Sequence, residues 1–163
     1  MARKKRLYVH YGADRFDSTK FGTIKNCTYP WVKPVHETGM WASPAKSKWG
    51  WKDWCIAEGF HPENLKESFS FTLKSGAKVF HVRNLDDLVK LPERLGDSLP
   101  TALSRYCIDF EALAKKYDAI EVHLSEDPSG ARGDLYYALY GWDCDSILIL
   151  NPNVVEEVRH EAC

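Results

Sequence analysis

The sequence predicts a single α+β domain, and three observations support this fold class. The chain has 163 residues, which is enough for one domain with a substantial hydrophobic core. Segments rich in β-branched and aromatic residues recur along the whole chain, and short segments with helical spacing separate them. No internal repeat or low-complexity tract interrupts this alternation, which favours a mixed sheet with short helices between its strands.

The strands are predicted from apolar or alternating runs that end at turn residues. Gly12 ends the first run, and Asn151-Pro152 stops the last, "DSILIL", which is the clearest buried strand in the chain. Two runs flank Ser75-Gly76, a favourable two-residue turn, so we expect these two to form a β-hairpin. The strands expected in one twisted sheet system are Leu7–Tyr11, Met40–Ala42, Phe69–Leu73, Val79–Val82, Ala119–His123 and Ile147–Leu150.

Short helices are predicted between these strands. Asp17 or Ser18 can cap the first, and Asn84 can cap the leucine-spaced segment "NLDDLVKLPERL". We expect "WGWKDWCIAEGF" to form a helix whose first turn lies at Pro44–Lys48, and "DFEALAKKY" to form the last helix before a strand. One domain is therefore expected over residues 1–163, with a basic tail at 1–6 and a C-terminal tail at 156–163.

Composition and charge argue against several classes of protein. Charged residues make up 28% and hydrophobic residues 44%, as in a soluble globular domain. With 22 Lys and Arg against 23 Asp and Glu, the net charge of -1 gives no global support for nucleic-acid or membrane binding. No apolar run is long enough to span a membrane, and no apolar core follows the basic start "ARKKR", so we expect neither a membrane span nor a secretion signal.

Cysteine and histidine spacing gives no sign of a metal site. The five cysteines are scattered and include no CxxC pair, which favours reduced thiols and a cytoplasmic location. The histidines at 36, 61, 81 and 123 have no ligand-like spacing. The sequence therefore predicts no metal centre.

Tryptophan is the unusual feature of the composition. Six occur in the chain, and five of them lie between Trp31 and Trp54. In "TGMWASP", Trp41 stands between the turn-type Gly39 and the small residues Ala42 and Ser43. A hydrophobic core would favour an aliphatic residue there, whereas a flat pocket for a flat ligand suits an aromatic ring beside small residues.

Three segments resemble the ADP-ribosyltransferase fold in its His–Tyr–Glu branch, the diphtheria-toxin-like and poly(ADP-ribose)-polymerase-like enzymes. They are the strand ending "VHYG", the strand and helix "TGMWASPAKSKWGWKDWC", and the late strand "DSILILNPNVV". The strand "YDAIEV" is similar to one in small bacterial members. The resemblance implies a split, strongly bent β-sheet with a central NAD cleft and peripheral helices.

Residue by residue, the resemblance places the NAD site on the first two strands. His10 stands in the place of the family histidine, and Trp41 in the place of the tyrosine. The histidine would hold a ribose hydroxyl, and the tryptophan would stack on the nicotinamide ring. The family glutamate falls on Ser146, a departure from the pattern. The residues expected to bind NAD are His10, Tyr11, Gly12, Trp41, Ala42 and Ser43.

The catalytic carboxylate is sought among three nearby acids. Cleavage of the bond between ribose and nicotinamide creates an oxocarbenium-like centre, which a carboxylate stabilises. In "WDCDS", strand alternation would place Asp143 and Asp145 on one face. We expect Asp145 to be the catalytic acid because it directly precedes the strongest strand, with Asp143 second and Glu121 third.

The resemblance implies a glycosyltransferase that uses NAD as a substrate. The expected activity is mono-ADP-ribosyl transfer to a macromolecular acceptor, which is either a protein or a nucleic acid. The alternatives are NAD glycohydrolysis, with water as the acceptor, and a non-catalytic module that binds a nucleotide or a partner. RNA 2′-phosphotransfer ranks lower, because it needs several arginines and the expected cleft offers Arg15 and Arg83.

Overall fold

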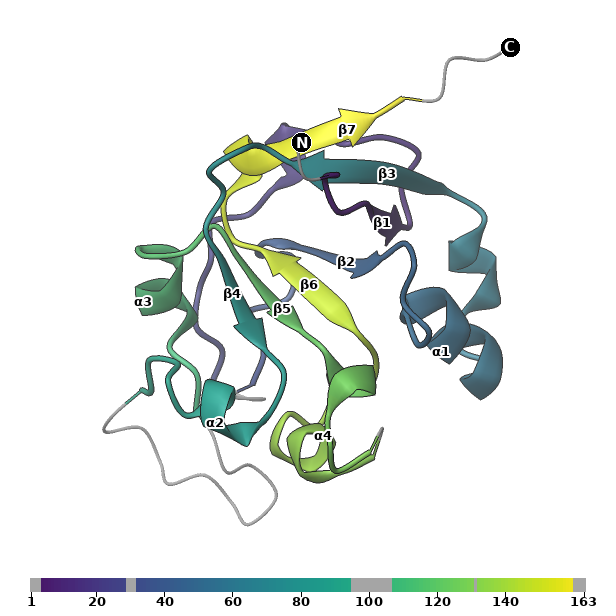
Figure 1. Ribbon diagram of the computed structural model, residues 1–163. Coiled ribbons are helices and arrows are strands. Elements are labelled where there is room, and N and C mark those ends of the chain that lie inside the picture. Colours follow the sequence, from purple (N-terminus) through teal and green to yellow (C-terminus); the bar gives the residue numbers. More distant parts are fainter. Residues whose placement is uncertain (1–3, 29–31, 95–106, 131, 160–163) are drawn as a thin grey trace.

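The computed structural model describes residues 4–28, 32–94, 107–130 and 132–159 (Figure 1). It has the predicted α+β class, with one open mixed sheet of seven strands in the order β4-β5-β6-β2-β1-β3-β7. All neighbouring strands are antiparallel except β4 and β5. The strands are β1 Tyr8–Tyr11, β2 Met40–Pro44, β3 Ser68–Leu73, β4 Val79–Val82, β5 Ala119–Val122, β6 Ser146–Ile149 and β7 Val155–Val158. All six strands expected from the sequence are present.

Helices are short and lie between the strands. Two of the predicted caps are confirmed, since Asn84 accepts a hydrogen bond from the amide of Asp87 and Asp17 accepts one from that of Thr19. The α-helices are α1 Trp51–Glu58, α2 Leu85–Leu88, α3 Phe110–Ala114 and α4 Asp134–Ala138. Single 3₁₀ turns occupy Ser18–Lys20, Pro62–Leu65, Leu124–Glu126 and Pro152–Val154. Within the described part of the chain, no helix is both long and apolar enough to cross a membrane.

The sheet consists of two parts joined at a short seam. Strands β4, β5, β6 and β2 form one part, and β1, β3 and β7 form the other. The ladder between β1 and β2 pairs Tyr8 with Pro44 and Val9 with Ser43. Figure 1 shows β3 and β7 running across the top of the molecule while β4, β5 and β6 fan out below them. The two parts of the sheet are therefore joined through the ladder of β1 and β2.

Each face of the sheet carries its own hydrophobic cluster, because successive residues of a strand point to opposite faces. On β2, Trp41 packs against the cluster that contains Ile120 and Leu148. Its neighbour Ala42 belongs to the other cluster, with Ile147 and Tyr8. Trp41 pairs with Leu148 and Ala42 with Ile147 in the ladder, so the register of β2 decides which residues face which side.

The predicted hairpin is wrong. The turn at Ser75-Gly76 exists, with Gly76 at a φ of 86°, but it does not join paired strands. Strand β3 pairs with β1 and β7, which occupy both of its edges. The chain therefore crosses to the far side of the sheet, where β4 pairs in parallel with β5 (Figure 1).

Three segment boundaries also differ from the prediction. Pro44 ends β2, and helix α1 starts at Trp51, where the Gly50 amide donates to the Asp53 carboxylate at 2.8 Å. Residues 155–158 form β7 instead of a tail, because β3 offers them an open edge. Helix α2 ends at Leu88 and is therefore much shorter than the helix predicted from the leucine spacing. Residues 95–106 lie outside the described part of the chain.

Candidate functional site

The candidate site lies where β1 and β2 separate. Their ladder stops after Val9 and Ser43, and beyond it His10 Nδ1 lies 2.6 Å from the carbonyl oxygen of Trp41. The carbonyl can only accept, so Nδ1 carries the proton and donates it. Burial lowers the pKa of His10, and this hydrogen bond opposes the shift in part. The imidazole is therefore neutral near pH 7, with Nε2 as an acceptor.

His10 and Trp41 are common to two adjoining hollows. One, of about 590 Å³, is lined among others by Tyr11, Ser43, Trp51 and Ser146. The other, of about 1010 Å³, is lined among others by aromatic residues and acids of the segment 13–21. The smaller hollow, here called the cleft, thus brings together residues from β1, β2, the start of α1 and the start of β6.

Most of the residues predicted to bind NAD line this cleft. They are His10, Tyr11, Trp41, Ala42 and Ser43. Gly12 instead lines a smaller neighbouring hollow with Tyr11 and Trp51. Its φ of 101° favours glycine, and its amide donates to the carbonyl of Glu67 at 3.0 Å. Gly12 therefore terminates β1 and does not touch the cleft directly.

Trp41 is held firmly at the wall of the cleft. Its ring meets the edge of Trp142 with centroids 4.7 Å apart. The Lys33 ammonium lies 5.7 Å from the centroid of the Trp41 ring, a distance that allows a cation–π contact. Burial lowers the pKa of Lys33, and nearby Asp143 opposes that shift. Neither Lys33 nor Trp142 was predicted for the site, because both lie in segments without a strand pattern.

The two serines of the cleft have separate local roles. Ser43 Oγ donates to the carbonyl of Asp145 and accepts from the amide of Trp51, each at 2.9 Å. It therefore anchors the first turn of α1 to the strand beside it. Ser146 Oγ donates to the carbonyl of Cys144 at 3.0 Å. Ser146 lines the cleft at the position that the resemblance assigns to glutamate.

Asp145 serves the structure outside the cleft. Its carboxylate accepts from the Ser125 amide at 2.8 Å, from the Ser125 hydroxyl, and from the Ser47 hydroxyl at 2.7 Å. The side chain is buried, and Asp145 is not among the residues that line either hollow. The three hydrogen bonds fasten the loop after β5 to the loop before α1. The structure therefore gives Asp145 a structural contact network in place of the expected position facing a ligand.

Asp143 is linked to the cleft through its charged neighbour Lys33. The prediction that Asp143 and Asp145 share a strand face is wrong, because β6 begins at Ser146 and Asp143 has a φ of 48°. Asp143 carries a pKa raised by burial, and the Lys33 ammonium partly reverses that shift. Lys33 itself lines the cleft, so a charged pair stands at its border.

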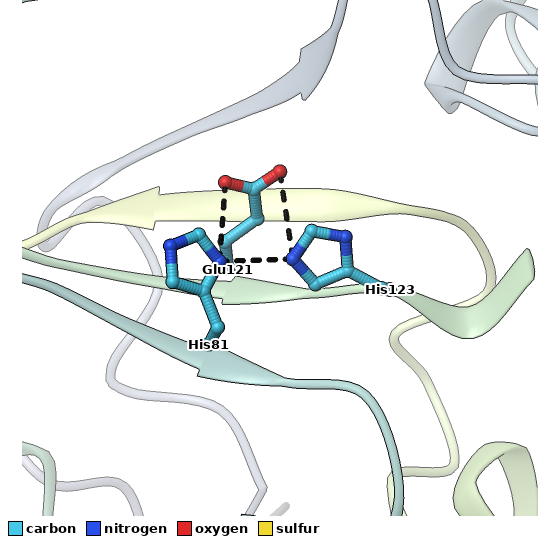
Figure 2. Close-up of side chains that lie close together, drawn as sticks. All are labelled: His81, Glu121 and His123. Carbon is cyan, nitrogen blue, oxygen red and sulfur yellow. Dashed lines mark hydrogen bonds and ion pairs between the residues drawn. The ribbon is translucent and has the colours of Figure 1, made fainter. Parts of the chain in front are cut away.

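Glu121 belongs to a different region, on the face of Ala42 and Tyr8. Its side chain is fully buried; one oxygen accepts from the Tyr8 hydroxyl at 2.8 Å and the other lies 2.7 Å from an Arg6 nitrogen. The histidines His81 and His123 lie beside it, as Figure 2 shows. Arg6 is thus part of a buried contact and not of a free basic tail. We call His81, Glu121 and His123 the His–Glu–His cluster.

The His–Glu–His cluster was missed at the level of sequence because its members come from two strands. His81 lies on β4 and pairs directly with Glu121 on β5. The signal that could have found it is the alternation in "EVH", which puts Glu121 and His123 on one face. The alternation alone does not reveal His81, because His81 meets Glu121 only through the parallel pairing of β4 with β5. The predicted hairpin paired the strand of His81 with residues 69–73 instead.

Comparisons with protein families, with curated proteins and with solved structures found no match to this chain. The interpretation of the cleft and of the cluster therefore comes from their own geometry and from the short motifs described above.

Proposed function

We propose that this protein binds NAD in the cleft and transfers its ADP-ribosyl group to a macromolecular acceptor. The observation that carries the proposal is the junction of His10 and Trp41. These residues are 31 positions apart in sequence, yet they adjoin through a hydrogen bond of 2.6 Å at the wall of one hollow. The resemblance implies such a contact between the strand that carries the histidine, β1, and the strand that carries the aromatic residue, β2.

The chemistry of the lining suits the nicotinamide end of NAD. The exposed part of the Trp41 ring offers a flat apolar surface for the nicotinamide, whose stacking contributes about 1 kcal/mol beyond burial. Neutral His10 has an acceptor at Nε2, which suits a ribose hydroxyl. The rings of Trp51 and Tyr11 supply further apolar wall. A flat heteroaromatic ring joined to a sugar fits this combination better than a fatty or purely charged ligand.

Transfer requires the bond between nicotinamide nitrogen and ribose carbon to break. Nicotinamide leaves as a neutral molecule with the bonding electrons, and a nucleophilic atom of the acceptor bonds to the same carbon and loses its proton. Positive charge develops on the ribose before the new bond is complete. None of the three candidate acids lines the cleft itself. We favour Asp143 for stabilising this charge, because it interacts with Lys33, which does line the cleft, whereas Asp145 is engaged by three donors and Glu121 is bound by Tyr8 and Arg6.

A second candidate function is NAD or nucleotide binding without turnover. One observation favours it: Ser146, which lines the cleft where the resemblance expects a carboxylate, offers a hydroxyl that donates to a backbone carbonyl. A hydroxyl carries no charge and stabilises a cationic centre much less than a carboxylate does. On this alternative, the same lining residues bind the ligand and no bond is broken.

One experiment separates these functions. The purified protein is incubated with NAD, and free nicotinamide, free ADP-ribose and adducts on lysate protein and nucleic acid are measured by mass spectrometry. Nicotinamide with adducts supports transfer, and nicotinamide with free ADP-ribose supports glycohydrolysis. Calorimetric binding without release of nicotinamide supports the binding module. Failure to bind NAD at all overturns both proposals.

The binding role of Trp41 has its own test. Trp41→Ala should weaken NAD binding by about 1–3 kcal/mol, because it removes the stacking surface. Tyr137, which is exposed on α4 and does not line the cleft, is the aromatic control. Tyr137→Ala should leave the affinity for NAD unchanged in calorimetry. Equal affinities for the wild type and Trp41→Ala would reject stacking.

A further inference from the structure

The His–Glu–His cluster has the spacing of a set of metal ligands. His81 Nδ1 and His123 Nε2 lie 3.0 Å apart, and each lies 3.8 Å from the nearer oxygen of Glu121 (Figure 2). All three ligand atoms fall within 4.8 Å of one another. Two nitrogen ligands at about 2.0–2.1 Å from one tetrahedral Zn²⁺ ion are themselves about 3.3 Å apart. The nitrogen pair at 3.0 Å and the two nitrogen–oxygen pairs at 3.8 Å lie on either side of this separation, so small side-chain movements would bring all three to it.

The Glu121 carboxylate has a cation as its partner on one oxygen. Glu121 is fully buried, and the nitrogens closest to its Oε1 are Arg6 Nη2 at 2.7 Å and His123 Nε2 at 3.8 Å. No well-aligned hydrogen bond to Oε1 is formed among the described residues, so the charge of Arg6 is what compensates this oxygen. A metal cation bound between Glu121 and the two histidines would compensate it in the same way.

The surroundings hold the ligands in the orientation that a metal needs. His123 Nδ1 lies 3.5 Å from the Glu126 carboxylate, which favours the tautomer with its proton on Nδ1. Nε2 of His123 is then an acceptor, which takes a hydrogen bond from His81 Nδ1 in the metal-free state and could coordinate an ion in its place. The Tyr8 hydroxyl donates to Glu121 Oε2 at 2.8 Å and fixes the carboxylate plane. Such outer contacts are usual around histidine and carboxylate ligands. In the metal-free state a hydrogen bond joins His81 Nδ1 and His123 Nε2 across the position that the ion would occupy.

An ion can reach the cluster from one side. His81 lies on the edge strand β4, and its side chain is 35% exposed, whereas His123 is 2% exposed. The Arg6 side chain, 46% exposed, covers the Glu121 carboxylate from the N-terminal segment. Arg6 can move into solvent, so it acts as a competing cation for the same oxygen.

We propose that His81, Glu121 and His123 bind one divalent transition-metal ion of the Zn²⁺ type, which fastens the edge strand β4 to β5. Two imidazoles and one carboxylate form a ligand set that zinc commonly accepts. The site lies on the sheet face opposite the Trp41 ring, and none of its three ligand residues lines the cleft.

The test uses the full chain, stripped of metal with a chelator and titrated with Zn²⁺ by calorimetry. We expect one equivalent to bind and the melting temperature to rise; Co²⁺ should give visible absorption bands of nitrogen–oxygen ligation. His81→Ala removes a half-exposed ligand and should weaken binding by at least ~10-fold, the lower limit for loss of a group that supports a metal. Circular dichroism checks that this variant is folded.

Two further variants make the test specific. His61→Asn changes an exposed histidine outside the cluster whose φ of 39° suits asparagine, and it should bind Zn²⁺ as the wild type does. Arg6→Gln removes the competing cation and should bind Zn²⁺ more tightly than the wild type. The proposal is overturned if neither the wild type nor Arg6→Gln binds at micromolar Zn²⁺, if His81→Ala binds as tightly as the wild type, or if Arg6→Gln binds more weakly.

Discussion

Asp145 and Glu121 are both buried carboxylates, one directly before strand β6 and the other on strand β5. Their surroundings differ in a way that separates a structural role from potential chemistry. Asp145 accepts three hydrogen bonds from two serines in two loops. Glu121 accepts one hydrogen bond, from Tyr8, and its second oxygen makes an ion pair with the half-exposed Arg6 at 2.7 Å. The partners of Asp145 are all serine groups of the chain's own loops, whereas one partner of Glu121 is a half-exposed cation that another cation can replace.

The difference teaches that burial and charge alone do not identify a functional acid. The sequence favours Asp145 as the catalytic residue because it precedes the strongest strand, and its backbone is indeed held, with its amide donating to the Trp49 carbonyl and its carbonyl accepting from the Ser43 hydroxyl. The same rigidity lets its carboxylate connect the loop that contains Ser47 with the turn that contains Ser125. Functional candidates are better sought where a polar group has fewer partners than it can accept.

The largest expected effect concerns Asp143, the acid that we propose acts on a ligand in the cleft. If Asp143 stabilises the developing positive charge, Asp143→Asn should reduce nicotinamide release from NAD by at least ~100-fold while NAD still binds. Asp145→Asn is the comparison, and any loss there should follow the folded fraction alone. Full activity in Asp143→Asn together with a true catalytic loss in Asp145→Asn would reverse the contrast between the two residues.

Next in size is the structural role of Asp145. Asp145→Ala leaves the Ser125 amide and two hydroxyls without their acceptor, which should lower the free energy of unfolding by about 2–3 kcal/mol. Asp143→Ala, at a half-buried position, should cost less than ~1 kcal/mol. Urea unfolding followed by tryptophan fluorescence measures both. Similar losses of stability in the two variants would mean that the hydrogen bonds from Ser47 and Ser125 to Asp145 do not stabilise the fold.

A smaller effect is expected from Tyr8, which orients Glu121. Tyr8→Phe keeps the ring packed against Phe71 and removes the hydrogen bond to the carboxylate. The free energy of unfolding should fall by about 1–2 kcal/mol, because a buried carboxylate loses its donor. Added Zn²⁺ should restore part of this loss by neutralising Glu121. A Tyr8→Phe protein as stable as the wild type would show that Glu121 needs no donor there.

The smallest expected effect is a pH dependence carried by His10. Burial lowers its pKa in the folded state below the unfolded value of about 6.5. The unfolded chain therefore binds a proton more readily than the folded one, so stability should fall as pH decreases below about 6.5. His10→Gln should show a flatter decline between neutral and mildly acidic pH in urea titrations. An unchanged slope would place the acid sensitivity elsewhere in the chain.

The sequence was most informative where local pattern decides structure. Alternation and turn residues located the strands. The run around Trp41 lies at the wall of a hollow, while its role in binding a flat ligand stays a prediction. Strand positions follow from neighbouring residues, whose side-chain directions are given directly by the backbone. The position of Gly39 in a turn is likewise local, since its φ of 73° favours glycine.

The sequence failed where pairing between distant strands decides the outcome. The turn at Gly76 suggested a hairpin, yet β3 and β4 pair with other strands, and no local signal reports which edges are already occupied. The same gap hid the His–Glu–His cluster, whose contact between His81 and Glu121 exists only through the parallel pairing. The orientation of Asp145 was also unpredictable, because Ser125 reaches it from 20 residues away.

The short seam between β1 and β2 has a consequence for the motions of the molecule. In most sheets the central amides exchange with deuterium last, because many ladder bonds must open together. Here two residue pairs, Tyr8 with Pro44 and Val9 with Ser43, form the ladder at the centre, and the His10 side chain bridges the gap beside them. Amides at the seam should therefore exchange sooner than those of β5 and β6, although both lie in the middle of one sheet.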